Sequence, residues 1–295
     1  MTAYTTLARV AVASSRPAQL LLVGGVYLLG VKIAGASGGA PTARAVALGA
    51  VPLFALAASI HYANEYADHE TDALTDRTPF SGGSGALAET GASRALVGRL
   101  AVVALAAGVV ATAGVAAAGV LDSRGVGLLA VATAFGWQYS VGPLRLAWRG
   151  WGELTNAALG GLALPVYGGA VAGGPLDRVA LASIPLFLLV LLNLFATQWP
   201  DRHADATVGK RTLAVRWPAG RLRRVYALVA ALAAASLLVL HPGVIPTPVA
   251  LASLPVVPLV GYGAYGYTER RIPWPTVTAM VALAALQFAG WCVAA

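Results

Sequence analysis

The sequence predicts an all-α integral membrane protein, a single domain of residues 1–295 with nine transmembrane helices, its N-terminus in the cytoplasm and its C-terminus outside. Three observations predict this class: the composition, the number of long apolar stretches and the placement of the basic residues. Of the 295 residues, 58% are hydrophobic and only 11% are charged, whereas a soluble globular domain carries about 25% charged residues. This composition excludes a soluble enzyme, a disordered chain and a free-standing nucleic-acid binder. The single cysteine, Cys292, excludes an internal disulfide framework and a cysteine-based zinc site.

Nine stretches are apolar enough to cross a membrane, because a helix needs about 20 mostly apolar residues to span the hydrocarbon core. They lie at residues 17–35, 45–66, 94–117, 124–141, 153–173, 179–198, 222–240, 246–267 and 274–294. The first stretch has no clear small-residue cleavage site, so we expect it to be a retained helix and not a signal peptide. Nine crossings place the two termini on opposite sides of the membrane.

The basic residues are distributed unevenly between the two sides. On the side of the N-terminus lie 16 of the 20 lysines and arginines, and the opposite side keeps Lys32, Arg44, Arg124 and Arg178. Cytoplasmic loops carry the excess of positive charge, so this asymmetry predicts a cytoplasmic N-terminus in the cell membrane. The asymmetry also accounts for the net charge of +8. These residues are expected to face anionic lipid headgroups, so a nucleic-acid partner is not needed to explain them.

Seven of the 12 acidic residues form two clusters, both on the predicted cytoplasmic side. The first cluster, at the end of the second stretch, consists of Glu65, Asp68, Glu70, Asp72 and Asp76. The second cluster, Asp201 and Asp205, follows the sixth stretch. An acid at a membrane boundary is costly unless it is solvated, paired or bound to a metal, so two such clusters indicate a functional site.

The spacing of these residues predicts a metal site. Asn64, Asp68 and Asp72 stand one helical turn apart, and residues 197–205 repeat the spacing with a threonine and two aspartates. Like charges one turn apart repel, and two such rows can meet only with a cation between them. Oxygen ligands without a histidine or cysteine cluster suit a hard cation, so the expected ion is Mg²⁺, completed by water and phosphate oxygens.

Cationic, glycine-rich segments follow both aspartate rows, at residues 77–85 and 209–212. Glycine allows backbone N–H groups to approach an anion, and arginine or lysine neutralises it. We therefore expect Arg77 and Lys210 to bind the phosphate groups of a substrate.

A third polar segment, residues 139–145, follows the fourth stretch and contains a Gly-Pro turn. A tyrosine at a membrane boundary commonly belongs to the aromatic belt. If the ring of Tyr139 faces a cavity instead, its π-face could stabilise a cationic intermediate.

These motifs resemble those of the UbiA superfamily of intramembrane prenyltransferases. Residues 64–72 resemble its first motif, NDxxDxxxD, with Glu65 in place of the usual aspartate, and residues 201–205 resemble its second motif, DxxxD. Thr197 stands where many members have an asparagine. Residues 77–85 and 209–213 look most like the branch that prenylates 1,4-dihydroxy-2-naphthoate in menaquinone biosynthesis.

The resemblance implies a U-shaped bundle with a central cavity, and it implies a role for each matching residue. Mg²⁺ ions bridging a prenyl diphosphate would be held by Asp68, Asp72, Asp201 and Asp205. Asn64 would contact metal or phosphate, Arg77 and Lys210 would bind the diphosphate, and Tyr139 and Arg145 would lie near the reacting carbon or the leaving group.

We therefore expect a Mg²⁺-dependent prenyltransferase, transferring a prenyl group within the membrane to an aromatic acceptor of the quinone-precursor type. An isoprenoid chain partitions into lipid while its diphosphate cannot, and a site at the cytoplasmic ends of apolar helices meets both demands. Two alternatives remain open at this point. One is a terpene cyclase of the same superfamily, acting on a prenyl diphosphate without an acceptor. The other is a transporter that uses the acids as an ion path, which would place charges nearer the bilayer midplane.

Overall fold

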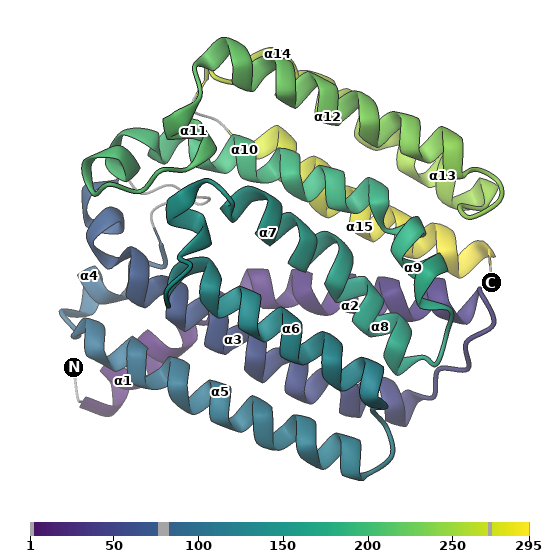
Figure 1. Cartoon of the computed structure of the whole chain (residues 1–295), viewed down its shortest axis with the longest axis horizontal. Helices are drawn as coiled ribbons and strands as arrows, with labels where there is room; N and C mark the ends of the chain where they lie inside the picture. The colour runs from purple at the N-terminus through teal and green to yellow at the C-terminus, as the bar shows by residue number, and fades with distance from the viewer. Residues whose placement is uncertain (1–2, 76–82, 271–272, 295) are drawn as a thin grey trace.

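The computed structural model describes residues 3–75, 83–270 and 273–294, and within these ranges all regular secondary structure is helical (Figure 1). The first half of the chain contains α1 (Ala3–Ser14), α2 (Pro17–Gly35), α3 (Ala43–Leu74), α4 (Ala86–Thr90), α5 (Arg94–Ala117), α6 (Ser123–Ser140) and the 3-10 helix η1 (Leu146–Arg149). The second half contains α7 (Gly152–Ala158), the π-helix η2 (Leu159–Ala163), α8 (Leu164–Val171), α9 (Leu176–Ala182), α10 (Ile184–Thr207), α11 (Leu213–Arg216), α12 (Ala219–Leu240), α13 (Thr247–Ser253), the 3-10 helix η3 (Leu254–Val256), α14 (Val257–Gly266) and α15 (Trp274–Ala294).

Eight helices in the described ranges are long and apolar enough to cross a membrane. Two of them are composite: α7, η2 and α8 join as Gly152–Val171, and α13, η3 and α14 join as Thr247–Gly266. The predicted stretch at 124–141 corresponds to α6, which is not among the eight. Its 18 residues include polar groups at both ends, such as Arg124 and Gln138, which lower the mean hydropathy of the whole helix. An integral membrane protein is therefore supported with eight candidate spans.

The sixth predicted stretch, 179–198, is wrong in its boundaries. The helix is interrupted at Ser183, between α9 and α10, and α10 then continues to Thr207. The Ser183 hydroxyl donates to the Val179 carbonyl at 2.7 Å, and Pro185 in the next turn has no N–H to continue the α9 hydrogen-bond pattern. The second aspartate motif consequently lies inside a helix. The same holds for the first motif, because α3 continues to Leu74.

The long helices run side by side, with α5 and α12 at opposite edges of the view in Figure 1. The two termini lie at opposite ends of the bundle. One end carries α1, α4, α11, the last turn of α3 and the connections that follow α6 and α10. Two of the polar segments that the sequence analysis singled out, residues 139–145 and 209–212, thus lie at the end that holds the N-terminus; of residues 77–85, the structure describes 83–85 alone.

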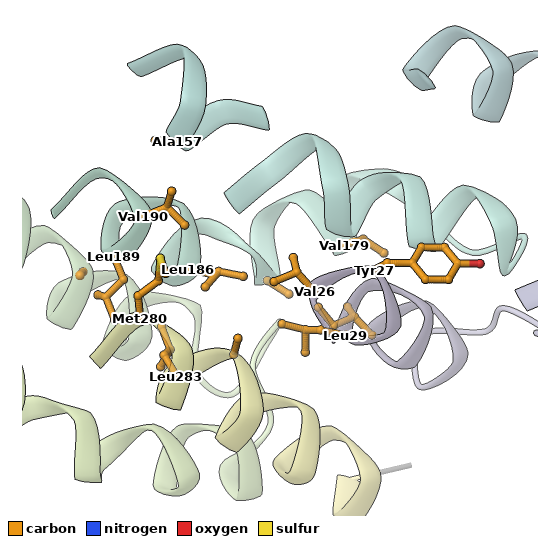
Figure 2. Close-up of a cluster of buried hydrophobic side chains, with 14 of the residues drawn as sticks. Val26, Tyr27, Leu29, Ala157, Val179, Leu186, Leu189, Val190, Met280 and Leu283 are labelled. Carbon is orange, nitrogen blue, oxygen red and sulfur yellow. The ribbon is translucent and has the colours of Figure 1, made fainter. Parts of the chain in front are cut away.

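The core lies between α2, α10 and α15 (Figure 2). Leu186 and Leu189 of α10 approach Met280 and Leu283 of α15, and Val26 of α2 extends the same apolar cluster. The burial of these side chains orients α10, because one face of the helix packs against α15. The last two turns of α10 carry the aspartates.

Two glycines allow α2 and α8 to approach closely. A Cβ atom at Gly30 would overlap the backbone of Pro165, and a Cβ atom at Gly168 would overlap the carbonyl of Tyr27. Small residues at helix crossings are the usual basis of association in lipid, where apolar side chains gain little from leaving their surroundings. This contact fixes the span that begins at α7 against α2.

Candidate active site

The two aspartate rows meet at one cation, the ammonium group of Lys210. Its Nζ lies 3.0 Å from Asp68 Oδ1 on α3 and 3.5 Å from Asp205 Oδ1 on α10. The side chains of Lys210 and Asp68 are 12% and 13% exposed, and that of Asp205 only 3%. The sequence analysis expected Mg²⁺ between the rows and assigned Lys210 to a diphosphate; in this structure the ammonium group of Lys210 lies between the rows.

The turn after α10 explains how Lys210 reaches this position. Gly209 follows the end of the helix with a φ of +79°, a left-handed conformation that glycine adopts without strain. The backbone N–H of Lys210 then donates to the Asp205 carbonyl at 2.8 Å. The chain therefore reverses over the last turn of α10, and the lysine returns to the aspartate of its own helix.

Burial alone would lower the pKa of Lys210, but the carboxylates of Asp68 and Asp205 outweigh it and raise the pKa above the ordinary value of a lysine. The lysine therefore stays protonated at physiological pH. It neutralises carboxylates that would otherwise repel across the gap between α3 and α10.

Asn64 connects the first row to the end of α6. With its amide nitrogen turned toward the neighbouring acceptors, Asn64 donates to Asp68 Oδ2 at 3.0 Å and contacts Ser140 Oγ at 2.6 Å. In that orientation its oxygen accepts from Arg16 Nη1 at 3.2 Å. The amide thus fixes the rotamer of Asp68 and leaves the other carboxylate oxygen to Lys210.

Glu65, the residue that departs from the family motif, anchors the connection that follows α3. It is 3% exposed, and its carboxylate accepts from the backbone N–H of Ser84 at 3.2 Å and from the Ser84 hydroxyl. Arg16 Nη2 lies 3.2 Å from the same carboxylate. A Cβ atom at Gly83, whose φ is +67°, would overlap the Asp72 carboxylate. Glu65 therefore holds the end of the glycine-rich segment against the first aspartate row.

The segments after α6 and α10 also lie side by side. Arg211 donates its backbone N–H to the Trp148 carbonyl at 3.1 Å, and Leu213 donates its backbone N–H to Glu153 Oε1 at 2.6 Å. The Tyr139 ring packs against the backbone at Gly152, where an added Cβ would come within 3.2 Å of Cε2. The predicted tyrosine thus belongs to the same end of the bundle as Lys210.

The remaining predicted residues are placed as follows. Asp201 is half-buried on α10, one turn before Asp205, and Asp72 is half-buried on α3, one turn after Asp68. Arg145 is exposed, with its guanidinium 4.0 Å from the centre of the Trp148 ring, whereas the cation that Asp68 and Asp205 contact is Lys210. Arg77 lies outside the described residues.

The oxygen-rich donors fit a magnesium ion that is shared with a substrate. Among the described residues no three His, Cys, Asp or Glu side chains form a ready metal cluster. Mg²⁺ bound with phosphates is typically held by only one or two carboxylates, with substrate oxygens and water completing its shell. Asp68 and Asp205 share the ammonium group of Lys210 across the gap, so their charge and separation suit a metal ion that takes its place.

Sequence reasoning missed two residues of this region. Arg16 was interpreted only as a topology determinant, although it contacts both Glu65 and Asn64. Glu153, which is 1% exposed, was not considered. A signal for Glu153 was available, because it is an acid at the start of an apolar stretch on the same predicted side as the aspartate rows.

Comparison with known proteins decides the family. Residues 23–261 match the model of the UbiA prenyltransferase family. The chain belongs to this family. A search of curated proteins found no match for the sequence. This UbiA family member is therefore a membrane prenyltransferase, and family membership favours the enzyme over the transporter.

Solved structures share the fold of this UbiA prenyltransferase across nearly its whole length. A UbiA homologue from Archaeoglobus fulgidus, described as bound to DMAPP and Mg²⁺, is 16% identical, with a TM-score of 0.69 and coverage of 96% of this chain and 99% of the other. A UbiA homologue from Aeropyrum pernix K1 is 15% identical, with a TM-score of 0.74 and coverage of 94% and 98%. A digeranylgeranylglyceryl phosphate synthase is 11% identical, with a TM-score of 0.68 and coverage of 97% and 98%.

Proposed function

We propose that this enzyme transfers a prenyl group from a prenyl diphosphate to an aromatic acceptor, within the membrane and with Mg²⁺. The observation that carries the proposal is the meeting of Asp68 and Asp205 at one cation, at the end of an apolar bundle. The A. fulgidus homologue, which has the same fold, is described with DMAPP and Mg²⁺. A diphosphate at this end would leave its prenyl chain among the apolar helices.

Each of the predicted site residues has a separate role in the proposed reaction. Asp68, Asp72, Asp201 and Asp205 would hold Mg²⁺, which supplies positive charge to the departing diphosphate oxygens. Lys210 would move from the carboxylates to the diphosphate, and Arg77 would bind it from the glycine-rich segment. Asn64 keeps Asp68 in its rotamer. The ring of Tyr139 would stabilise the positive charge that develops on the allylic carbon as its bond to oxygen breaks. Arg145, exposed beside Trp148, would act at the rim of the site.

For the acceptor, we propose 1,4-dihydroxy-2-naphthoate, the substrate of the menaquinone branch. The support is the sequence resemblance in residues 77–85 and 209–213, the second of which adjoins the aspartate rows through Lys210. The acceptor carbon forms a bond to the allylic carbon, the diphosphate leaves, and the acceptor ring loses a proton. Water has to be excluded, because it would capture the cation as an alcohol.

Product analysis tests this function. The purified enzyme is incubated with a panel of prenyl diphosphates, with and without 1,4-dihydroxy-2-naphthoate, and the products are identified by mass spectrometry. We expect a prenylated naphthoate that forms with Mg²⁺ and not with EDTA. Hydrocarbon released from the prenyl diphosphate alone would indicate a cyclase, and activity undiminished by EDTA would contradict the metal assignment.

We further propose that nine helices, α6 included, cross the cell membrane as a U-shaped bundle around a central cavity, with the N-terminus and the active site on the cytoplasmic side. The charge asymmetry of the sequence supports this orientation. Gly220 lies in the first turn of α12 and Gly243 follows its C-terminal end, and both are exposed with open space at the Cβ position. In a Cys292→Ala background, an impermeant maleimide should label Gly243→Cys and not Gly220→Cys in intact cells. The reverse pattern would overturn the orientation.

A further inference from the structure

Glu153 is a buried carboxylate with one oxygen unused. It stands in the first turn of α7 and is 1% exposed. Oε1 accepts the backbone N–H of Leu213 at 2.6 Å, whereas Oε2 is buried without a hydrogen-bond partner. A buried carboxylate oxygen is normally paired, and an unpaired one requires a reason such as a ligand or a catalytic role.

The groups around Glu153 belong to the candidate active site. Its charge interacts with those of Asp205 and Lys210, and with the hydroxyl of Tyr139. The Tyr139 hydroxyl forms a hydrogen bond with the side chain of Asn156, which lies one turn after Glu153 on α7. Glu153 is therefore next to the aspartate rows, on the side of Tyr139.

Glu153 is poorly suited to be a further magnesium ligand. One of its oxygens is committed to the Leu213 N–H at 2.6 Å, so a metal ion could not take both oxygens without breaking that bond. Tyr267, a second buried side chain, also has a hydroxyl without a hydrogen-bond partner, and its ring packs against that of Tyr226, with centroids 4.7 Å apart. The free oxygen of Glu153, whose chain neighbour Gly152 lies against the Tyr139 ring, thus offers a hydrogen bond to something other than the metal.

We propose that Glu153 Oε2 binds a hydroxyl group of the acceptor, so that the acceptor substrate is a hydroxyl-bearing ring held beside Tyr139. The inference rests on the proposed transferase function. A carboxylate that accepts a hydrogen bond from a phenolic O–H increases the electron density of the ring, which favours attack on the allylic carbon. Glu153 would both orient the ring and select acceptors that carry a free hydroxyl.

Equilibrium binding of the acceptor tests this role without requiring turnover. The probes are 1,4-dihydroxy-2-naphthoate and its dimethyl ether, and the proteins are the wild type and Glu153→Gln. The glutamine keeps an oxygen for the Leu213 N–H but replaces Oε2 by an amide nitrogen that cannot accept. We expect the dihydroxy compound to bind about ten-fold to 100-fold more weakly to the variant, as for other hydrogen bonds to charged groups. The dimethyl ether should bind both proteins equally weakly.

The matched control is Glu89→Gln, the same substitution at an exposed site whose partner is Arg9. It should leave the binding of both probes unchanged, and Glu153→Gln should leave the Mg²⁺-dependent binding of a prenyl diphosphate unchanged. Equal affinity of the wild type and Glu153→Gln for the dihydroxy probe overturns the inference, and so does a wild type that binds neither probe. The proposed function fails by a different result, namely a wild type that does not consume prenyl diphosphate with Mg²⁺.

Discussion

Two buried glutamates flank the aspartate rows, and their surroundings differ. Glu65, beside the row on α3, has both oxygens occupied, by Arg16 and by the backbone N–H and hydroxyl of Ser84. Glu153, beside the row on α10, has one oxygen bonded to Leu213 and the other without a partner. A carboxylate whose bonds are complete stabilises a fold, whereas one that is half satisfied has capacity left for a ligand. The comparison assigns stability to Glu65 and substrate recognition to Glu153.

The largest expected effect lies between the two glutamates, in the aspartate rows themselves. Asp68→Ala or Asp201→Ala should lower kcat/KM by about 100-fold or more, because each removes a carboxylate proposed to hold the metal. Size-exclusion chromatography in detergent should show both variants folded. The proposal requires both aspartate rows for Mg²⁺ binding, so full activity of either variant would contradict the assignment of the site.

Lys210→Ala should come next. Removing the ammonium leaves the buried carboxylates of Asp68 and Asp205 facing each other, and it removes a group that would bind the diphosphate. We expect activity to fall by about ten-fold to 100-fold and Mg²⁺ to raise the Tm of the variant more than that of the wild type. Lys32→Ala, on α2 and outside the site, is the control. Equal Mg²⁺ responses in the two variants would show that Lys210 and the metal do not compete for the carboxylates.

Glu65→Ala tests whether Glu65 stabilises the fold and does not bind the acceptor. It leaves Arg16 and the Ser84 N–H without their carboxylate, so the free energy of unfolding should fall by about 3 kcal/mol. Thermal unfolding in detergent measures the loss. The affinity for the naphthoate probe should change little in the folded fraction, in contrast to Glu153→Gln. An unchanged Tm together with weakened acceptor binding would reverse the roles that we assign to the two glutamates.

The smallest effect is expected far from both glutamates, at the start of α6. Asp122 Oδ1 accepts the backbone N–H of Gly125 at 2.9 Å, and this bond, followed by Arg124, lowers the pKa of Asp122. Asp122→Ala should cost about 1 kcal/mol at neutral pH. The cap stabilises the protein above the ordinary pKa of an aspartate and is lost as the pH falls through the lowered value, so wild type and variant should converge in acid. A difference in Tm that persists at low pH would contradict this origin.

The sequence predicted the long helices well where one hydrophobic run fills the whole span. The boundaries of α2, α5 and α15 coincide with predicted stretches. The prediction was less accurate where polar groups continue a helix beyond its apolar run, as in α3 and α10, because hydropathy does not detect a polar helical turn. The helix period did establish that Asp68 and Asp72 share a face, as do Asp201 and Asp205.

The sequence by itself determined the membrane class, the aspartate rows and their family, because these depend on composition and on spacing along single helices. Only the tertiary structure decided which charges meet. Lys210 lies between two carboxylates, one 142 residues before it in the chain and the other five residues before it, and Arg16 reaches a glutamate 49 residues away. It also distinguished Glu65 from Glu153, which look alike as acids at the ends of apolar runs. The chain after α10 donates the Leu213 N–H to Oε1 of Glu153, and Oε2 is left without a hydrogen-bond partner.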